Sequence, residues 1–257
     1  MGKNKKIDHI NKSSYVKKNI LKYYSINKDL WESEKTIFEK YKHYIIDKKI
    51  LDVGCGGGRT TEHLRKLSKK YIGIDYCQEM IASCKKQYPD LIFLQSDARD
   101  MSVFKDHEFD FVIFSGNGID SIDYNGRIKS LKEISRVLKH EGLFAFSSHN
   151  LNFKGIPFEI PMFNSFNPKI LFKNIVKKYN HYKYKKFEIH SNGYSILNDP
   201  AHGFSFLVFY VEKDFQIRLL EEIGIKNIEV IASDGIFSPT ASQLMESPYL
   251  YYLGWKE

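Results

Sequence analysis

The sequence has few cysteines and no long apolar run. Three cysteines occur among its 257 residues, and Cys55, Cys77 and Cys84 have neither C-x-x-C spacing nor a clustered histidine partner. A zinc site and a disulfide framework are therefore not expected, and we predict no metal. No run of about 18 apolar residues occurs, and the basic segment 1–6 is not followed by the apolar stretch of a signal peptide. We expect a soluble protein of the reducing cytoplasm, with no membrane partner.

Acidic residues are outnumbered, so the chain is basic overall. There are 31 aspartates and glutamates against 39 lysines and arginines, which gives a formal net charge of +8. Much of the excess lies in the N-terminal tail and between Lys169 and Lys186. A basic surface can bind nucleic acid, but lysine, isoleucine and asparagine are frequent throughout, which favours lysines that only solvate the surface. We therefore do not expect a nucleic-acid partner, and a positive cleft for a phosphorylated substrate is an intermediate alternative.

A glycine-rich stretch over residues 50–62 is the strongest local signal. An apolar run ending in Asp52-Val53 predicts a buried strand, the glycines after it predict a tight turn, and Thr60 predicts the start of a helix. Glycine lets the backbone approach a ligand closely, and the N–H groups at a helix N-terminus favour anionic or polar ligand groups. The stretch predicts a nucleotide-like cofactor, with a purely structural turn as the alternative.

Spacing separates two cofactor classes that use such a loop. The dinucleotide fingerprint G-x-G-x-x-G/A, counted from Gly54, needs Gly or Ala where this chain has Arg59, so a dehydrogenase is disfavoured. The pattern present is D-x-G-x-G-x-G. A second apolar strand over 71–75 ends in Asp75, 21 positions after Gly54, about where a carboxylate accepts both ribose hydroxyls.

Further segments follow in a fixed order. They are a strand over 91–95 ending in Ser96-Asp97-Ala98, a strand over 109–114 opening into Ser115-Gly116-Asn117-Gly118, and a helix over 131–141 stopped by Gly142 before a strand over 143–147. Together with the glycine loop and Asp75, they resemble the class I S-adenosylmethionine (SAM) dependent methyltransferases over about residues 35–150.

The resemblance implies a doubly wound, Rossmann-like α/β fold. Its sheet would have seven mostly parallel strands, the last one antiparallel, with active-site loops at the strands' C-terminal ends. SAM would be the cofactor and S-adenosylhomocysteine its product, and Asp97 and Ala98 would hold the adenine edge. The predicted cofactor-binding residues are Asp52, Gly54, Cys55, Gly56, Gly58, Asp75, Tyr76, Met80, Asp97, Ala98 and Ser115.

We expect four segments along the chain. They are an N-terminal tail and capping helix (1–34), the SAM-binding core (35–150), an inserted substrate-binding lid (151–212), and a helix with closing strands of the core (213–257). The lid is predicted because prolines and aromatics replace the βα rhythm there. Outside the core we predict irregular chain over 1–14, helices over 15–24, 33–44 and 213–224, and strands over 187–195, 203–212, 228–232 and 249–255.

Methyl transfer from SAM requires few specific catalytic groups. The sulfonium methyl of SAM is already activated by positive charge, so the enzyme mainly aligns the acceptor, and a base is needed only if the acceptor arrives protonated. His149, after the fifth strand, would project into the substrate mouth and take that proton. A hydrogen-bonded structural histidine is the equal alternative. The predicted substrate-binding residues are Tyr23, Tyr24, Trp31, Asn117, His149, Asn150 and His202.

Absent motifs narrow the acceptor. After the fourth strand the chain lacks the Asn/Asp-Pro-Pro-aromatic tetrad of base amino-methyltransferases and the paired glutamates of protein arginine methyltransferases. Asp120 and Asp123 give no oxygen cage for Mg²⁺. We expect an O- or N-methyltransferase of a small molecule, by analogy a phosphorylated or sugar metabolite of surface-glycan or secondary-metabolite assembly, acting as a monomer or homodimer. A tRNA or rRNA methyltransferase and a non-catalytic SAM-fold binding subunit stay open.

Overall fold

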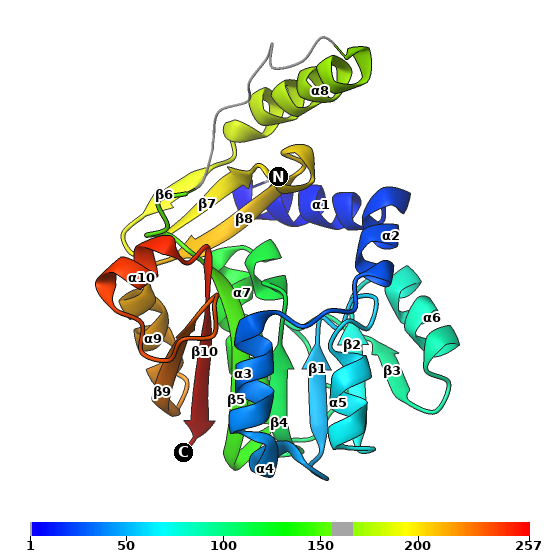
Figure 1. Cartoon of the computed structure of the whole chain (residues 1–257), viewed down its shortest axis with the longest axis vertical. Helices are drawn as coiled ribbons and strands as arrows, with labels where there is room; N and C mark the ends of the chain where they lie inside the picture. Colours follow the sequence, from blue (N-terminus) through cyan, green and yellow to red (C-terminus); the bar gives the residue numbers. More distant parts are fainter. Residues whose placement is uncertain (1, 156–166) are drawn as a thin grey trace.

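The computed structural model describes residues 2–155 and 167–257, which form a mixed α/β structure (Figure 1). The part of the predicted lid over 156–166 lies outside the described residues. The strands are β1 (Ile50–Val53), β2 (Tyr71–Asp75), β3 (Ile92–Gln95), β4 (Phe109–Phe114), β5 (Leu138–Asn150), β6 (Ile189–Ser191), β7 (Tyr194–Asp199), β8 (Phe206–Val211), β9 (Ile225–Ala232) and β10 (Tyr249–Lys256). The helices are α1 (Lys3–Tyr15), α2 (Lys18–Ile26), α3 (Glu32–Lys40), α4 (Lys42–Ile45), α5 (Thr61–Leu67), α6 (Gln78–Gln87), α7 (Tyr124–Val137), α8 (Pro168–Lys185), α9 (Lys213–Glu221) and α10 (Ala241–Glu246), with short 3₁₀ turns η1 (Gly118–Ser121) and η2 (Ala201–Gly203).

Seven of the strands form the expected sheet, in the order β3-β2-β1-β4-β5-β10-β9. Strands β3, β2, β1, β4 and β5 run parallel to their neighbours, and β10 is antiparallel to both β5 and β9. The predicted Rossmann-like, mostly parallel sheet with an antiparallel last strand is confirmed. The direction of strand addition reverses at β1, and open α/β sheets bind ligands outside the carboxyl ends of the strands at such a point.

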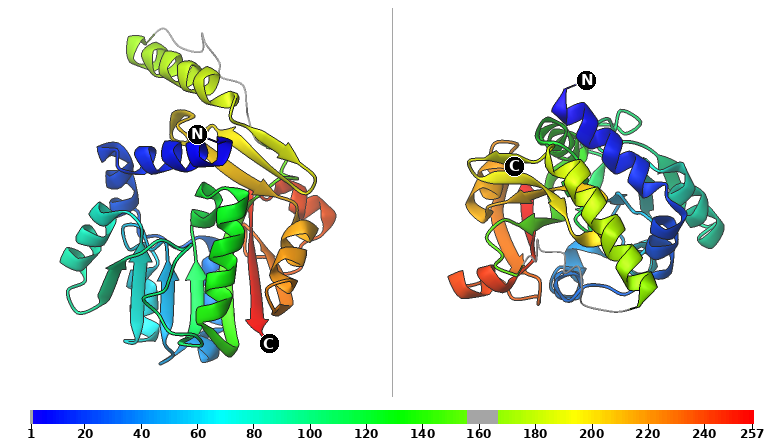
Figure 2. Two further views of the ribbon diagram at one scale, coloured as in Figure 1. Left: turned by 180° about the vertical axis from the view of Figure 1, so that it is seen from behind. Right: turned by 90° about the horizontal axis from the view of Figure 1, so that it is seen from above.

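Helices bury both faces of this sheet, as the apolar strand sequences require. Figure 1 shows α3 and α5 on the near face, and the view from behind in Figure 2 shows α7 on the other. Neighbouring residues of β1 alternate between the two layers, since Ile50 packs with Leu64 of α5 and Leu51 packs in the cluster that contains Leu131 of α7. The sheet is thereby fixed, and its C-terminal strand ends are held in place.

Strands β6, β7 and β8 form an antiparallel ribbon that extends the sheet. β8 pairs with β7 and β7 with β6, both antiparallel. Beyond the end of β4, β8 also runs parallel to the last residues of β5, where His149 pairs with Tyr210. The single strand predicted over 187–195 is wrong, because Gly193 has a φ of +84° and turns the chain between β6 and β7.

The prediction of irregular chain over residues 1–14 is also wrong, because α1 occupies most of it. Ile7 and Ile10 are buried with Leu207 and Phe209 of β8, and Asn11 donates its side-chain amide to the carbonyl of Leu207 at 2.7 Å. Two isoleucines in a polar segment are a weak helical pattern, and packing on the ribbon supplies the stability that the local sequence lacks. In Figure 1, α1 and α2 lie across the C-terminal ends of the strands.

The helix predicted over 131–141 has different bounds. α7 begins at Tyr124, where Asp123 caps it by accepting the N–H of Gly126 at 3.0 Å, and it ends at Val137. Gly142 does not stop a helix but lies within β5, beside an irregularity in the pairing of β4 and β5. No helix in the described parts of the chain is long and apolar enough to cross a membrane.

Candidate active site

The glycine loop between β1 and α5 folds as a tight turn. Gly54 and Gly56 have φ values of +64° and +53°, which side chains rarely allow. A Cβ on Gly54 would lie 2.6 Å from the ring of Phe114, so no side chain fits there. The loop brings the N–H of Gly56 to Asp75, where it donates to Oδ2 at 3.0 Å. The turn therefore joins the ends of β1 and β2.

Asp75 lies at the C-terminal end of β2, before α6. Its Oδ1 accepts the N–H of Cys77 at 2.8 Å, and its Oδ2 accepts the N–H of Gly56. Burial raises the pKa of Asp75 to about 6, although both hydrogen bonds act in the opposite direction. An ionised carboxylate offers about four lone-pair sites, so about two of them are left for the hydroxyl groups of a ligand.

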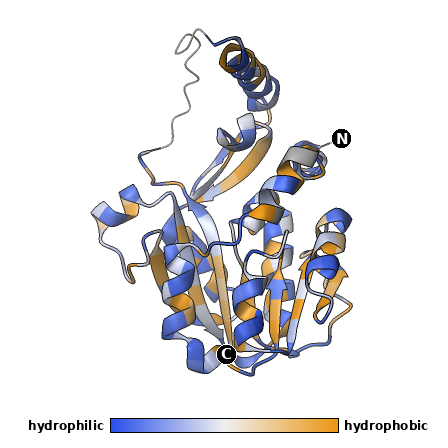
Figure 3. Cartoon of the chain, turned by 45° about the vertical axis from the view of Figure 1, so that its right-hand side comes forward, coloured by the Kyte–Doolittle hydropathy of each residue, from blue (hydrophilic) through white to orange (hydrophobic). Residues whose placement is uncertain are grey.

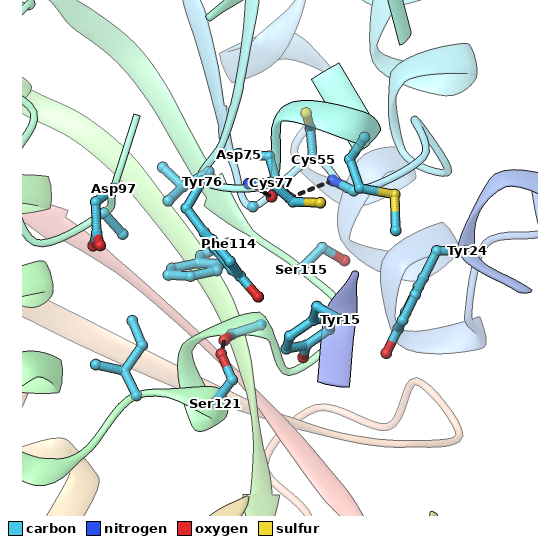
Figure 4. Close-up of a pocket in the computed structure, with 18 of the residues that line it drawn as sticks. Tyr15, Tyr24, Cys55, Asp75, Tyr76, Cys77, Asp97, Phe114, Ser115 and Ser121 are labelled. Atoms are coloured by element: carbon cyan, nitrogen blue, oxygen red, sulfur yellow. Dashed lines mark hydrogen bonds between the residues drawn. The ribbon is translucent and has the colours of Figure 1, made fainter. Parts of the chain in front are cut away.

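A first cavity extends from the glycine loop along the ends of β1, β2 and β4. Tyr15 and Tyr24, from α1 and α2, line it on the side away from Asp75 (Figure 4). Sequence reasoning missed Tyr15, because it depended on the placement of α1. The predicted cofactor-binding residues that line this cavity are Gly54, Cys55, Gly56, Asp75, Tyr76, Met80, Asp97, Ala98 and Ser115.

Two of the predicted cofactor-binding residues, Asp52 and Gly58, do not line this cavity. Asp52 is 1% exposed and accepts the hydroxyls of Thr60 and Tyr71 at 2.6 and 2.8 Å. Burial raises the pKa of Asp52 to about 6. A Cβ on Gly58 would lie 2.9 Å from the ring of Tyr88. Asp52 and Gly58 therefore stabilise the loop through hydrogen bonds and packing.

Asp97, the predicted adenine contact, is held by an arginine. Arg99 donates Nε to Oδ1 at 2.8 Å and Nη2 to Oδ2 at 2.6 Å. Burial alone would raise the pKa of Asp97, but Arg99 holds it below its ordinary value. Arg99 also donates to Asp8 of α1 at 2.9 Å, and Lys12 lies 3.5 Å from Asp97. The adenine role of Asp97 stays a prediction. No pattern in the sequence indicates that α1 supplies charges here.

A buried ion pair stands between this cavity and a second one. Glu34 of α3 is fully buried and accepts Arg59 Nη2 at 2.6 Å and the hydroxyl of Tyr251 at 2.5 Å. Burial would raise the pKa of Glu34, but its hydrogen bonds and the charge of Arg59 hold it below the ordinary value. Arg59 lines both cavities and donates to Ser115 at 2.8 Å. In the sequence analysis, Arg59 serves only as evidence against a dehydrogenase. Glu34 is missed because it lies 25 positions from Arg59.

The second cavity opens beside the first, and Tyr15, Tyr24 and Arg59 line both. Asn150 is the predicted substrate-binding residue that does not line it. The Asn150 side-chain amide donates to the carbonyls of Leu244 and Ser247, at 2.6 and 3.0 Å, and so ties β5 to α10. The predicted substrate-binding residues that line the second cavity are Tyr23, Tyr24, Trp31, Asn117, His149 and His202.

His149, at the end of β5, is held by a buried carboxylate. Its Nδ1–H donates to Oδ2 of Asp120 at 2.7 Å, and its backbone N–H donates to the same oxygen at 2.7 Å. In the neutral ring, an Nδ1–H that donates to a carboxylate leaves the lone pair on Nε2. Nε2 accepts the side-chain N–H of Asn117 at 3.3 Å, a contact that the O–H or N–H of a ligand would have to replace. The geometry equips His149 to take a proton from a ligand in the second cavity.

Asp120 is itself paired with a fully buried arginine. Arg127 of α7 donates Nη1 to Asp120 Oδ1 at 2.6 Å and Nη2 to Ser148 and Gln216 at 2.9 and 2.7 Å. The hydroxyl of Ser148 donates to Asp120 at 2.6 Å. Asp120 is therefore fixed from both sides. The sequence analysis considers Asp120 only as a possible metal ligand and does not single out Arg127, because β5, α7 and α9 come together only in the fold.

Comparison with known sequences finds a family for the core. Residues 51–146 match a family model described as a methyltransferase domain. A demethylmenaquinone methyltransferase of Chlorobaculum tepidum is 35% identical over 97 residues, which are 37% of this chain and 38% of that protein. The Bacillus subtilis protein YqeM, a methyltransferase by its name, is 33% identical over 109 residues, or 40% and 42% of the two chains. These matches cover less than half of each relative.

Solved structures share the fold along most of the chain. The 1,6-didemethyltoxoflavin-N1-methyltransferase of Burkholderia thailandensis, which holds 1,6-didemethyltoxoflavin and S-adenosylhomocysteine, gives a TM-score of 0.61 at 12% identity and covers 100% of this chain and 91% of its own. A SAM-dependent methyltransferase of Thermotoga maritima gives 0.57 at 15% identity, with 98% and 100% covered. Residues 51–146 therefore match a methyltransferase domain, within a fold that the chain shares with these solved structures.

Proposed function

We propose that this chain transfers a methyl group from SAM to an oxygen or nitrogen of a small molecule in the second cavity, with His149 as the general base. The observation that carries the proposal is the hydrogen bond from His149 Nδ1–H to the buried carboxylate of Asp120. It leaves Nε2 able to accept a proton beside a cavity that adjoins the predicted cofactor site.

The first cavity has groups that suit SAM, which supplies a methyl group activated by the positive charge of its sulfonium. Asp75 would accept the ribose hydroxyls through its remaining lone-pair sites. The backbone at Gly54 and Ser115 would face the methionine part, where the absence of a side chain at Gly54 permits close approach. The buried hydroxyl of Tyr76 has no hydrogen-bond partner among the described residues, which leaves it available to a ligand.

Proton removal is the task of the second cavity in this proposal. Nε2 of His149 would take the proton of an acceptor O–H or N–H as that atom gains the methyl group and S-adenosylhomocysteine leaves. Asp120 keeps the Nδ1 proton in place and stabilises the imidazolium that forms. Asn117 Oδ1, buried and without a partner among the described residues, can accept a hydrogen bond from the acceptor. The two side chains would orient the nucleophile.

The lining of the second cavity favours an uncharged acceptor. Tyr23, Tyr24 and Trp31 give it aromatic walls. Among the described residues that line it, no lysine occurs, and the guanidinium of Arg59 is already bound by Glu34. A phosphate group would lack a counter-charge there. An oxygen or nitrogen of an uncharged metabolite, such as a sugar, is therefore favoured over the phosphorylated acceptor that the sequence analysis also considers.

We also propose a division of labour along the chain. The described lining of the first cavity comes from residues 8–122, whereas the second cavity also takes Asp199, His202 and Phe206 from the segment 151–212. This difference supports 151–212 as the acceptor-binding insertion and 35–150 as the SAM-binding core, closed by 213–257. Residues 1–34 contribute to both cavities, and the cytoplasm is the proposed location.

Methyl-labelled SAM incubated with small-molecule fractions and, separately, with bulk RNA tests the function. We expect label in a low-mass product. His149→Gln should lower the rate by about 10²–10⁴-fold and leave SAM affinity unchanged. His190→Gln, whose side chain is 70% exposed, is the matched control and should change neither. If His149→Gln transfers methyl groups at the rate of the parent chain, His149 is not the general base. Label in RNA would favour the hypothesis of a tRNA or rRNA methyltransferase. SAM binding without methyl transfer would favour a non-catalytic binding subunit.

A further inference from the structure

Four apolar or aromatic side chains of helix α8 lie on one face that is turned away from the protein. Phe172, Ile175, Tyr179 and Tyr182 recur at spacings of three and four residues, which places them on one helix face. Their exposed fractions are 67%, 59%, 62% and 85%. Figures 1 and 3 show α8 standing clear of the main sheet, at the far side of the ribbon. These four residues are named the outer stripe, and they reverse the usual arrangement, in which the apolar face of a helix packs on the core.

The face of α8 that touches the protein is polar. Asn174 is buried, the side-chain amide of Asn180 donates to the carbonyl of Gly203 at 2.9 Å, and His181 Nδ1 lies 3.0 Å from Asn198 Oδ1. These contacts dock α8 on β7 and η2. The outer stripe is thus exposed because specific hydrogen bonds hold the opposite face against the ribbon.

Lysines supply all the formal charge of α8. Its 18 residues include six lysines and no aspartate or glutamate. Helical geometry places Lys183 on one side of the outer stripe and Lys185 on the other, and both are exposed. An apolar stripe with aromatic residues, bordered by lysines, is typical of helices that lie in the headgroup region of a membrane with anionic lipids.

We propose that α8 binds the surface of a membrane that contains anionic lipids, with the outer stripe among the headgroups and the lysines at the phosphates. A second copy fits less well, because it would bring two lysine-rich helices together in chains of net charge +8. Nucleic acid fits less well, because the aliphatic Ile175 does not stack on bases. The sequence analysis predicts no membrane partner because no apolar run is long enough to span a bilayer. A helix that lies in the headgroup region needs only one apolar face and one charged face.

Co-sedimentation of the full chain with lipid vesicles tests this proposal, which does not depend on the proposed function. We expect binding to mixed phosphatidylglycerol and phosphatidylcholine vesicles, little binding to phosphatidylcholine alone, and weaker binding as salt rises. Phe172→Ser/Tyr179→Ser should lower binding at least about tenfold. The matched control is Val103→Ser/Tyr44→Ser, at positions 61% and 46% exposed outside α8, and it should bind like the parent chain.

Charge is tested in the same assay. Lys183→Gln/Lys185→Gln should lower binding by about 25-fold, since one lysine near an anionic surface contributes about fivefold. Lys129→Gln/Lys132→Gln, at exposed positions of α7, is the matched control and should bind normally. SAM titrations of each variant check the fold, because the described lining of the first cavity includes no residue of α8.

Three results would overturn the proposal. One is absence of binding to the anionic vesicles by the parent chain, and another is an equal loss of binding in the control variants. The third is preferential assembly with another partner. A dimer that Phe172→Ser/Tyr179→Ser dissolves in light scattering would assign the outer stripe to a second copy, and tighter binding to RNA than to vesicles would assign α8 to nucleic acid.

Discussion

Replacing Asp120 by asparagine tests whether this buried carboxylate has both a structural and a catalytic task. Asp120 is 1% exposed, accepts Arg127 and Ser148 on Oδ1, and accepts His149 twice on Oδ2. Asp120→Asn leaves the fully buried Arg127 without a counter-charge, which should cost about 3–5 kcal/mol of unfolding free energy. Domains are typically stable by about 5–15 kcal/mol, so the variant should fold but unfold at much lower urea concentration.

Adding Arg127→Met separates the two tasks. A buried ion pair can be replaced by uncharged groups at little net cost, so the double variant should recover at least about half of the lost stability. Turnover should not recover. An amide in place of Asp120 no longer fixes the proton on His149 Nδ1, and the rate should stay lower by about 10⁴-fold, the scale for disrupting such a carboxylate–histidine pair.

Urea unfolding and initial rates of methyl transfer measure the two effects independently. Arg127→Met alone should also lose about 3–5 kcal/mol, because it leaves Asp120 unpaired. If the losses of the two single variants simply add in the double variant, the ion pair does not act as a unit. If the double variant turns over at the parental rate, His149 is not oriented by Asp120 and the base assignment is refuted.

Three further predictions concern the cofactor side. Arg59→Met should lower the unfolding free energy by about 3–5 kcal/mol at pH 7, because it leaves Glu34 ionised in a buried site. The loss should be smaller at pH 4, where Glu34 can be protonated. Urea unfolding at both pH values checks this. SAM affinity should fall about tenfold between pH 7 and pH 5, because burial raises the pKa of Asp75 to about 6 and the protonated form accepts fewer hydrogen bonds. Asp75→Asn should remove that dependence in calorimetry. For stability the sign is opposite: the folded pKa of Asp75 lies above the ordinary value of 3.8, so the free protein loses stability as pH rises from about 4 to about 6. Gly54→Ala should weaken SAM binding and cost about 1–3 kcal/mol, since its Cβ meets the Phe114 ring, whereas Gly224→Ala, with φ +81° but open space around it, should show only the backbone cost.

Local sequence patterns were enough for the core of the fold. The glycine loop, the apolar runs of β1, β2 and β4, and the acid at Asp75 are all encoded within a few neighbouring residues, so their order along the chain predicted the sheet. Strand bounds outside the core were less accurate. The helix at residues 3–15 depends on packing between α1 and β8, which no local pattern reveals. The turn at Gly193 has a local signal, because Asn-Gly pairs favour hairpin turns, and the predicted strand over 187–195 does not take it into account.

The polar side of the site could be predicted only in part. His149 was a candidate because it follows a strand that ends at the active edge. Its partner Asp120 lies 29 positions earlier, and the Glu34–Arg59 pair spans 25 positions. Such pairs form only when the fold brings together residues that are distant in the sequence. No local pattern in a single sequence shows which distant residues will meet. Asn150 shows the reverse case, since it neighbours His149 but alternation along β5 turns it toward α10.

Calorimetric titration with SAM, S-adenosylhomocysteine and NAD tests the central claim most directly. We predict that SAM and S-adenosylhomocysteine bind and that NAD does not. Asp75→Ala should weaken SAM binding by about 1–3 kcal/mol, the scale for lost hydrogen bonds to a charged group. Asp106→Ala, whose side chain is 65% exposed, should bind SAM like the parent chain. Equal affinity for NAD, or unchanged SAM affinity in Asp75→Ala, would contradict the account.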